Sequence, residues 1–166
     1  MRLSKSFALF EFLKSGVASR LGIELNPPTE DVRNLQLLCI HVLQPLRNKI
    51  GRPIRINSGW RSNELNKAIG GAFKVIKGRY VATSQHCQGK AADIVYIDRK
   101  GRMDNKLIFD TIIDSGIEFD QMINEFNYSW IHISYNKDNN RNEILEAYKD
   151  ENNKTKYKKI QQYKSL

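Results

Sequence analysis

The chain is poor in the residues that build disulfide-linked or membrane-spanning proteins. Among its 166 residues are only two cysteines, Cys39 and Cys87, which form no Cys-x-x-Cys pair. This excludes a structural zinc site built on cysteine pairs, and we expect both residues to be free thiols. The apolar stretch near the N-terminus is interrupted by Glu11 and Lys14 and lacks a small-residue cleavage site. The sequence therefore predicts no signal peptide and no membrane-spanning helix.

Acidic residues are scarce relative to basic ones. The 27 lysines and arginines outnumber the 18 aspartates and glutamates, which gives a formal net charge of +9. Such a charge attracts polyanions, and nucleic acid, an anionic membrane and the anionic bacterial wall all fit it. The alternative is a solvated basic surface, which residues 152–166 favour in part because they contain five lysines and no acid. The charge alone therefore selects no partner.

The length fits a single domain with its own hydrophobic core. We expect this domain over residues 1–148, followed by a tail over residues 149–166 that is rich in lysine, asparagine and glutamine and frays. Apolar residues at three- and four-residue intervals predict a helix that begins near Thr29 and runs past Leu46. Pro45 is expected to bend or shorten the last turn of this helix.

Other patterns predict the remaining elements. Alternating residues and short apolar runs indicate strands over residues 54–58, 91–97, 121–126 and 130–135. Helices are expected up to about residue 14 and over residues 63–69, 106–115 and 143–148, with residues 72–83 as a loop or hairpin. This mixture predicts an α+β fold, in which a small, mainly antiparallel sheet has helices packed on one side.

Two imidazoles and one carboxylate lie in settings that suit a catalytic zinc site. His86 and Asp93 stand on either side of Gly89, where a turn or bulge can bring both side chains to one ion, and His132 lies in an alternating strand. Catalytic zinc sites take three ligands of these types and keep a fourth position for water. Taken singly, each residue also fits a structural role, as a hydrogen-bonded histidine or a turn-capping aspartate.

These residues belong to a longer series of fragments. The series comprises Leu-Gln-Pro-Leu-Arg at 43–47, Pro-Ile-Arg-Ile-Asn-Ser-Gly-Trp-Arg-Ser at 53–62, Leu-Asn at 65–66, Gly-Gly at 70–71, Ser-Gln-His at 84–86, Gly-Lys-Ala-Ala-Asp at 89–93, Phe-Asp-Gln at 119–121 with Glu125, and Trp-Ile-His-Ile-Ser-Tyr at 130–135. In this order the fragments resemble the zinc D-Ala-D-Ala carboxypeptidase and L-Ala-D-Glu endopeptidase superfamily, which has the hedgehog/DD-peptidase fold. The resemblance is closest to its short phage- and bacterium-encoded branch and runs from Phe7 to Tyr135.

The resemblance implies one Zn²⁺ ion per chain, with His86, Asp93 and His132 as its ligands. It also implies that Glu125, seven residues before His132, is the general base. In much of the superfamily the catalytic acid stands three residues before the last zinc histidine, where this chain has Ser129. The alternative interpretation of Glu125 is a surface carboxylate at the end of a strand.

The resemblance further implies which residues contact the substrate. Arg61 is expected to bind a peptide carboxylate at two points or to stabilise an oxyanion, although it also fits a residue that caps the following helix. Ser84, Gln121 and Trp130 are expected to line the cleft and bind substrate, and Ser84 also fits a residue that only satisfies backbone groups.

The implied activity is zinc-dependent hydrolysis of an amide bond in peptidoglycan stem peptides, as a D,D-carboxypeptidase or an endopeptidase. We expect a monomer that is made in the bacterial cytoplasm and acts on the wall after release, as a phage lysis or virion enzyme, or acts on wall fragments within the cytoplasm. We expect no nucleic-acid partner and no membrane insertion. The first alternative is a catalytically inactive, zinc-containing wall-binding module, which Ser129 supports. The second is a basic nucleic-acid-binding domain, which rests on the charge alone.

Overall fold

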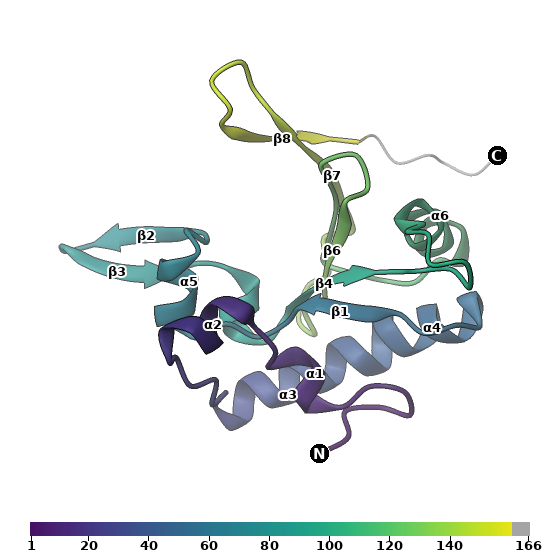
Figure 1. The fold of residues 1–166 in the computed structure, drawn as a ribbon, viewed down its shortest axis with the longest axis horizontal. Coiled ribbons are helices and arrows are strands. Elements are labelled where there is room, and N and C mark those ends of the chain that lie inside the picture. The colour runs from purple at the N-terminus through teal and green to yellow at the C-terminus, as the bar shows by residue number, and fades with distance from the viewer. Residues whose placement is uncertain (161–166) are drawn as a thin grey trace.

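The computed structural model describes residues 1–160, and its centre is a six-stranded sheet. The strands lie in the order β1-β4-β6-β5-β7-β8 (Figure 1). Their bounds are Arg55–Ser58 for β1, Ala91–Val95 for β4, Gln121–Glu125 for β5, Trp130–Ser134 for β6, Glu143–Lys149 for β7 and Thr155–Lys159 for β8. Strands β5 and β7 are parallel, and every other neighbouring pair is antiparallel. The predicted α+β fold with a mainly antiparallel sheet is confirmed.

One long helical segment supplies the largest apolar surface of the core. It consists of α3 (Thr29–Leu38), a π-helical stretch η1 (Cys39–Leu43) and α4 (Gln44–Ile50). Pro45 cannot donate a backbone hydrogen bond to the preceding turn, and the wider π-helical turn just before it accommodates this loss. The helix therefore continues past Pro45 to Ile50.

The core lies between these helices and one face of the sheet. The residues of β4, β6, β5 and β7 that point to this face are Ala92, Ile94, Ile131, Ile133, Met122 and Ile144, and all are buried. Helix α6 (Asn105–Ser115) adds Ile108 and Ile112 to the same core. Because side chains alternate along a strand, the odd-numbered residues of β4, β5 and β7 and the even-numbered residues of β6 point to the opposite face, which the helices leave uncovered.

Two predictions about the C-terminal part of the chain are wrong. Residues 143–148 were expected to form a short helix, but they belong to β7, which pairs with both β5 and β8. Glutamate, leucine and alanine favour a helix locally, and pairing on both sides overrides this preference.

The tail was expected to fray, but residues 155–159 form β8, in which Tyr157 pairs with Ala147 and Lys159 with Leu145. Residues 161–166, the rest of the predicted tail, lie outside the described part of the chain. A domain boundary between residues 148 and 149 would fall inside β7, and the division of the chain there stays a prediction.

The N-terminal helix is also shorter than predicted. Helix α1 covers only Leu9–Phe12, and a second helix, α2 (Gly16–Leu21), follows it. The backbone N–H of Ala18 donates to the Ser15 hydroxyl, which caps the start of α2, and Gly22 ends it in a left-handed conformation.

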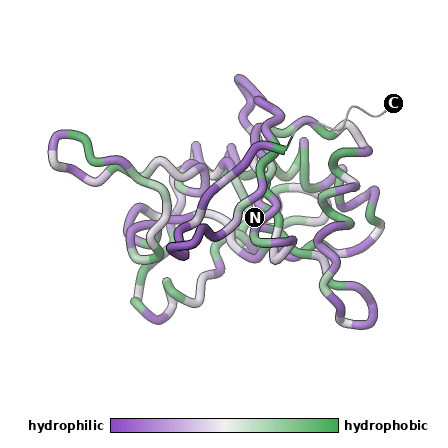
Figure 2. Tube along the Cα trace, turned by 90° about the horizontal axis from the view of Figure 1, so that it is seen from above, coloured by the Kyte–Doolittle hydropathy of each residue, from purple (hydrophilic) through white to green (hydrophobic). Residues whose placement is uncertain are grey.

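Residues 72–83 contain a separate two-stranded hairpin. Its strands are β2 (Phe73–Ile76) and β3 (Arg79–Ala82), and it follows helix α5 (Asn63–Ala68). The hairpin projects from the body of the molecule (Figure 1) and carries hydrophobic as well as hydrophilic residues (Figure 2). This settles the choice between loop and hairpin that the sequence left open.

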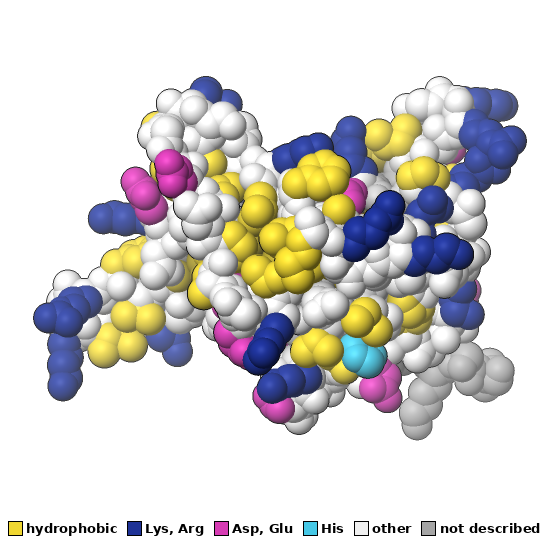
Figure 3. Space-filling view, turned by 90° about the horizontal axis from the view of Figure 1, so that it is seen from below, with side chains coloured by type: hydrophobic (Ala, Val, Ile, Leu, Met, Phe, Trp, Pro, Cys, Tyr) yellow, Lys and Arg dark blue, Asp and Glu magenta, His cyan; other side chains and the backbone are white. Residues whose placement is uncertain are grey.

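The structure also locates the cysteines and many of the basic side chains. Both cysteines are free thiols. Basic side chains are spread over the face shown in Figure 3 and do not gather in a single patch. Within residues 1–160, no helix has both the length and the hydrophobicity needed to span a bilayer.

Candidate active site

Three potential metal ligands converge on the uncovered face of the sheet. His86 lies in the short 3-10 helix η2 (Gln85–Gln88), Asp93 in β4 and His132 directly opposite Asp93 in β6. Asp93 Oδ1 lies 3.3 Å from His86 Nε2 and 3.0 Å from His132 Nδ1, and these two nitrogens are 3.3 Å apart. Donors bound tetrahedrally to zinc at about 2.0–2.1 Å are about 3.3 Å from one another. The three donors therefore fit a zinc ion in both type and spacing.

The 3-10 helix that carries His86 ends at Gly89. Gly89 ends this helix with φ at +65°, and a Cβ atom there would overlap the Asp31 backbone carbonyl. Only glycine fits this position, because it tolerates both the positive φ and the close approach. The turn at Gly89 brings His86 back over β4, so the predicted turn at this glycine is confirmed.

The segment Ser-Gly-Trp-Arg-Ser at 58–62 holds the histidine-bearing helix in place. The Gly59 carbonyl lies 2.7 Å from His86 Nδ1, so Nδ1–H donates to it and Nε2 is left unprotonated, toward Asp93. The Arg61 backbone N–H donates to the His86 carbonyl at 3.3 Å. Trp60 Nε1 donates to Asp31 at 2.8 Å, which ties this segment to helix α3. The motif therefore fixes both the position and the tautomer of His86.

Arg61 orients the carboxylate of Asp93. Its Nη2 donates to Asp93 Oδ2 at 3.0 Å, which leaves Oδ1 directed toward the two histidines. Nε and Nη2 of Arg61 also donate to the Ser58 hydroxyl at 3.3 and 3.0 Å. Within residues 1–160, Nη1 of Arg61 makes no hydrogen bond.

The charges of the three donors suit metal binding. Burial alone would raise the pKa of Asp93, but the adjacent His86 and His132 outweigh burial and hold this pKa below its usual range. Burial lowers the pKa of His86, and the opposing charge of Asp93 does not restore it. An ionised Asp93 beside a neutral His86 suits zinc, which binds carboxylates and unprotonated imidazole nitrogens.

Glu125 lies on the same face as the three donors. It is opposite Trp130, in the strand pair that places Ile123 opposite His132. Its side chain is mostly buried, and among residues 1–160 it makes no hydrogen bond. Burial raises the pKa of Glu125 to about 7, with the negative charge of Asp93 contributing and His132 and Arg61 opposing. Ser129 points elsewhere, since its hydroxyl donates to the Phe126 carbonyl.

A cleft of about 630 Å³ joins these groups. Every site residue expected from the sequence lines it: His86, Asp93, His132, Glu125, Arg61, Ser84, Gln121 and Trp130. The cleft also has lining residues that sequence reasoning missed, among them Arg141, Leu145, Thr155 and Tyr157. All four come after β6: Leu145 lies in the segment predicted to be a short helix, Thr155 and Tyr157 lie in the predicted tail, and Arg141 lies in a segment to which the sequence assigned no helix or strand.

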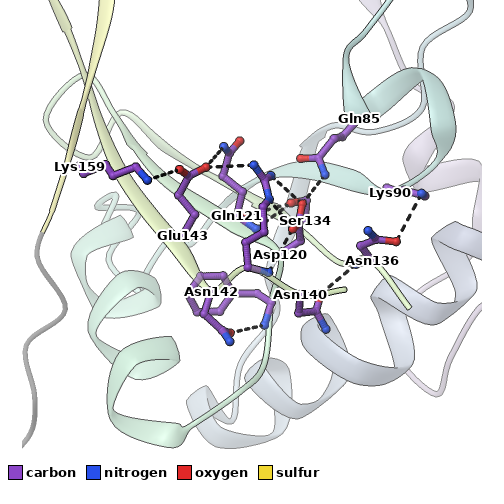
Figure 4. Close-up of polar contacts among 12 residues, drawn as sticks. Gln85, Lys90, Asp120, Gln121, Ser134, Asn136, Asn140, Asn142, Glu143 and Lys159 are labelled. Atoms are coloured by element: carbon purple, nitrogen blue, oxygen red, sulfur yellow. Dashed lines mark hydrogen bonds and ion pairs between the residues drawn. The ribbon is translucent and has the colours of Figure 1, made fainter. Parts of the chain in front are cut away.

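A polar network at the end of the cleft was also missed. Asp120 is 2% exposed and accepts from Arg141 Nε and Nη2 at 2.7 and 2.8 Å and from Gln85 Nε2 at 2.6 Å. Glu143 accepts from Gln121 at 2.7 Å and lies 3.1 Å from Lys159 Nζ (Figure 4). The network therefore links the helix that carries His86 to β5, β7 and β8. Asp120 belongs to the Phe-Asp-Gln fragment at 119–121, whereas its partner Arg141 belongs to none of the fragments that carry the family resemblance.

A buried His-Asp-His group beside a mostly buried carboxylate in an open cleft is the arrangement of a metal-dependent hydrolase. A family model described as Peptidase M15 matches residues 5–134. The chain therefore belongs to the M15 zinc peptidases, in the D-Ala-D-Ala carboxypeptidase superfamily. No curated protein matches the chain. The match ends at the last residue of β6, so β7 and β8 lie outside it.

Proposed function

We propose that this protein is a zinc peptidase that hydrolyses an amide bond in the stem peptides of peptidoglycan. The observation that carries the proposal is the set of three ligand atoms 3.0–3.3 Å apart, at a cleft that also contains Glu125. When bound, zinc supplies a Lewis acid that polarises the substrate carbonyl and lowers the pKa of a water molecule. His86, Asp93 and His132 would hold the ion.

Glu125 is the proposed general base. A carboxylate with a pKa near 7 accepts a proton from the attacking water at neutral pH and, once protonated, donates it to the leaving amine nitrogen. Its lack of a hydrogen-bond partner within residues 1–160 leaves both oxygens free for these transfers. The Glu125–Trp130 pair lies two residues along β5 and β6 from the Ile123–His132 pair, on the same face of the sheet, which supports a role for Glu125 beside the proposed metal ligands.

Arg61 and the residues lining the cleft are proposed to hold the peptide. Nη2 and Nε of Arg61 are occupied by Asp93 and Ser58, so Nη1 binds the substrate carboxylate or carbonyl at one point, not at two. Ser84, Gln121 and Trp130 line the same cleft and are proposed to contact the chain of the substrate. The net charge of +9 favours approach to the anionic wall, which fits an enzyme released by phage lysis or carried by a virion.

Mass spectrometry of defined muropeptides tests this function. We expect the zinc-loaded protein to shorten stem peptides at one bond, and a chelator to abolish this cleavage. Glu125→Gln should retain zinc and lose cleavage, whereas Glu146→Gln, on the opposite face of β7, should cleave like the wild type. Bound zinc without any cleavage would indicate the inactive wall-binding module instead.

A further inference from the structure

The β7–β8 hairpin extends the floor of the cleft beyond the part of the chain that matches the family. Across the sheet, Asp93 is opposite His132, His132 opposite Ile123, Ile123 opposite Leu145 and Leu145 opposite Lys159. Residues paired in this way point to the same face. The row that begins at the metal ligands therefore continues over an apolar floor of Ile123 and Leu145 and ends in β8.

The neighbouring row leads from Glu125 to a tyrosine. Glu125 lies opposite Ala147 of β7, and Ala147 lies opposite Tyr157 of β8. Neighbouring strands are about 4.8 Å apart, and β7 lies between β5 and β8. The backbones at Glu125 and Tyr157 are therefore about 10 Å apart. Ala147, the residue between them, carries only a methyl group and is buried at 1% exposure, so it does not project between the two longer side chains. Tyr157 lines the cleft together with Glu125 and Trp130, and its side chain is 53% exposed.

The surroundings of the phenol agree with this placement. Partial burial and the negative charges of Glu125 and Asp93 raise the pKa of Tyr157, so its hydroxyl stays protonated and can donate a hydrogen bond at neutral pH. An aromatic ring with a polar tip, beside an apolar floor, suits contact with a peptide that has both aliphatic groups and backbone carbonyls.

We propose that Tyr157 is a substrate-binding residue that forms the wall of the cleft opposite Arg61. This rests on the proposed function, because the occupant is the stem peptide. Arg61 lies beside β4 and Tyr157 belongs to β8, so the two residues bound the cleft from opposite ends of the sheet. The peptide lies between them, over Ile123 and Leu145, and its chain passes Glu125. The hairpin outside the matched segment is then part of the binding site.

Equilibrium binding of a synthetic stem pentapeptide ending in D-Ala-D-Ala tests this proposal without requiring turnover. The parent protein is zinc-loaded Glu125→Gln, and Tyr157→Ala and Tyr157→Phe are added to it. The matched control is Tyr148→Ala, because Tyr148 lies in the same hairpin, is 43% exposed and points to the opposite face. Circular dichroism checks that each variant folds.

We expect Tyr157→Ala to weaken binding about tenfold, Tyr157→Phe to weaken it less, and Tyr148→Ala to change it less than about twofold. Equal affinities for the parent and Tyr157→Ala would overturn the proposal. Equal losses in Tyr157→Ala and Tyr148→Ala would also overturn it, because the hairpin would then act through its stability. A parent that binds no peptide overturns it as well, while cleavage of muropeptides by the wild type decides the proposed function separately.

Discussion

The two ends of the cleft are built differently. At the metal end, His86 and Asp93 are 3% and 8% exposed, and each is held by a further residue, Gly59 or Arg61. At the β8 end, the side chains of Thr155–Lys159 are all exposed, and among residues 1–160 the strand pairs with β7 alone. Buried side chains that hydrogen-bond to a further residue tolerate few substitutions, whereas the exposed side chains of an edge strand tolerate many. The first end suits chemistry that requires fixed geometry, and the second suits selection among substrates.

Removing a metal ligand should have the largest effect. We expect His132→Ala to lose bound zinc and all cleavage above background, because two remaining donors cannot hold the ion in the cleft. Zinc content by elemental analysis and muropeptide cleavage measure the two losses. His41→Ala is the control, since this third histidine is exposed and stacks on Tyr135 at 4.8 Å. A His132→Ala protein that keeps zinc and activity would contradict the assignment.

Replacing the base should have the next largest effect. Glu125→Gln removes the proton acceptor but keeps the shape of the side chain, so kcat should fall about 10²–10⁴-fold while zinc stays bound. Steady-state kinetics on a muropeptide, together with zinc content, separates the two effects. If kcat is unchanged, the proton is accepted by another group.

The pH profile tests the same residue more finely. Because Glu125 must be ionised to accept a proton and its pKa is raised to about 7, kcat/KM should fall as the pH is lowered through that value. A bound cation nearby lowers a carboxyl pKa, so with zinc the midpoint is expected at or below about 7. The range from about pH 8 to about pH 5 spans the raised pKa of Glu125 and approaches the ordinary pKa of a glutamate. A kcat/KM that stays constant over this range would show that Glu125 does not accept the proton.

The network between the two ends should contribute to stability. Asp120→Asn keeps one acceptor oxygen but loses the charge that Arg141 requires, so the free energy of unfolding should fall by about 1–3 kcal/mol. Urea denaturation measures this change. Asp114→Asn, at an exposed position on α6, is the control and should have little effect. Equal denaturation midpoints for the two variants would show that the network between the ends of the cleft does not stabilise the fold.

The smallest effect is expected at the outer surface of the hairpin. Lys158 pairs with Glu146 at 2.9 Å, but the lysine is largely exposed and this face points away from the cleft. Exposed pairs of this kind contribute little, so Lys158→Ala should leave both the denaturation midpoint and cleavage unchanged. A clear loss of activity would mean that the two faces of the hairpin are not separate in function.

The sequence predicted the metal end of the cleft better than the β8 end for a physical reason. His86, Asp93 and His132 occupy segments with recognisable local patterns, and Gly89 signals the turn that brings them together. The fold class followed from the alternation of strands and helices in the same part of the chain.

The hairpin could not be predicted in this way. Strand β7 is formed by helix-favouring residues, and β8 has the lysine-rich composition of a solvated tail, so both depend on pairing between strands that no local pattern records. Tyr157 therefore had no signal in the sequence beyond being an isolated aromatic residue. Arg141 likewise becomes visible only through its contact with Asp120.

Anomalous diffraction at the zinc edge, from crystals grown with zinc, tests the central claim most directly. We predict one peak per chain at about 2.0–2.2 Å from His86 Nε2, His132 Nδ1 and Asp93 Oδ1. A peak bound by other residues, or no peak at these three atoms in zinc-soaked crystals, would contradict it.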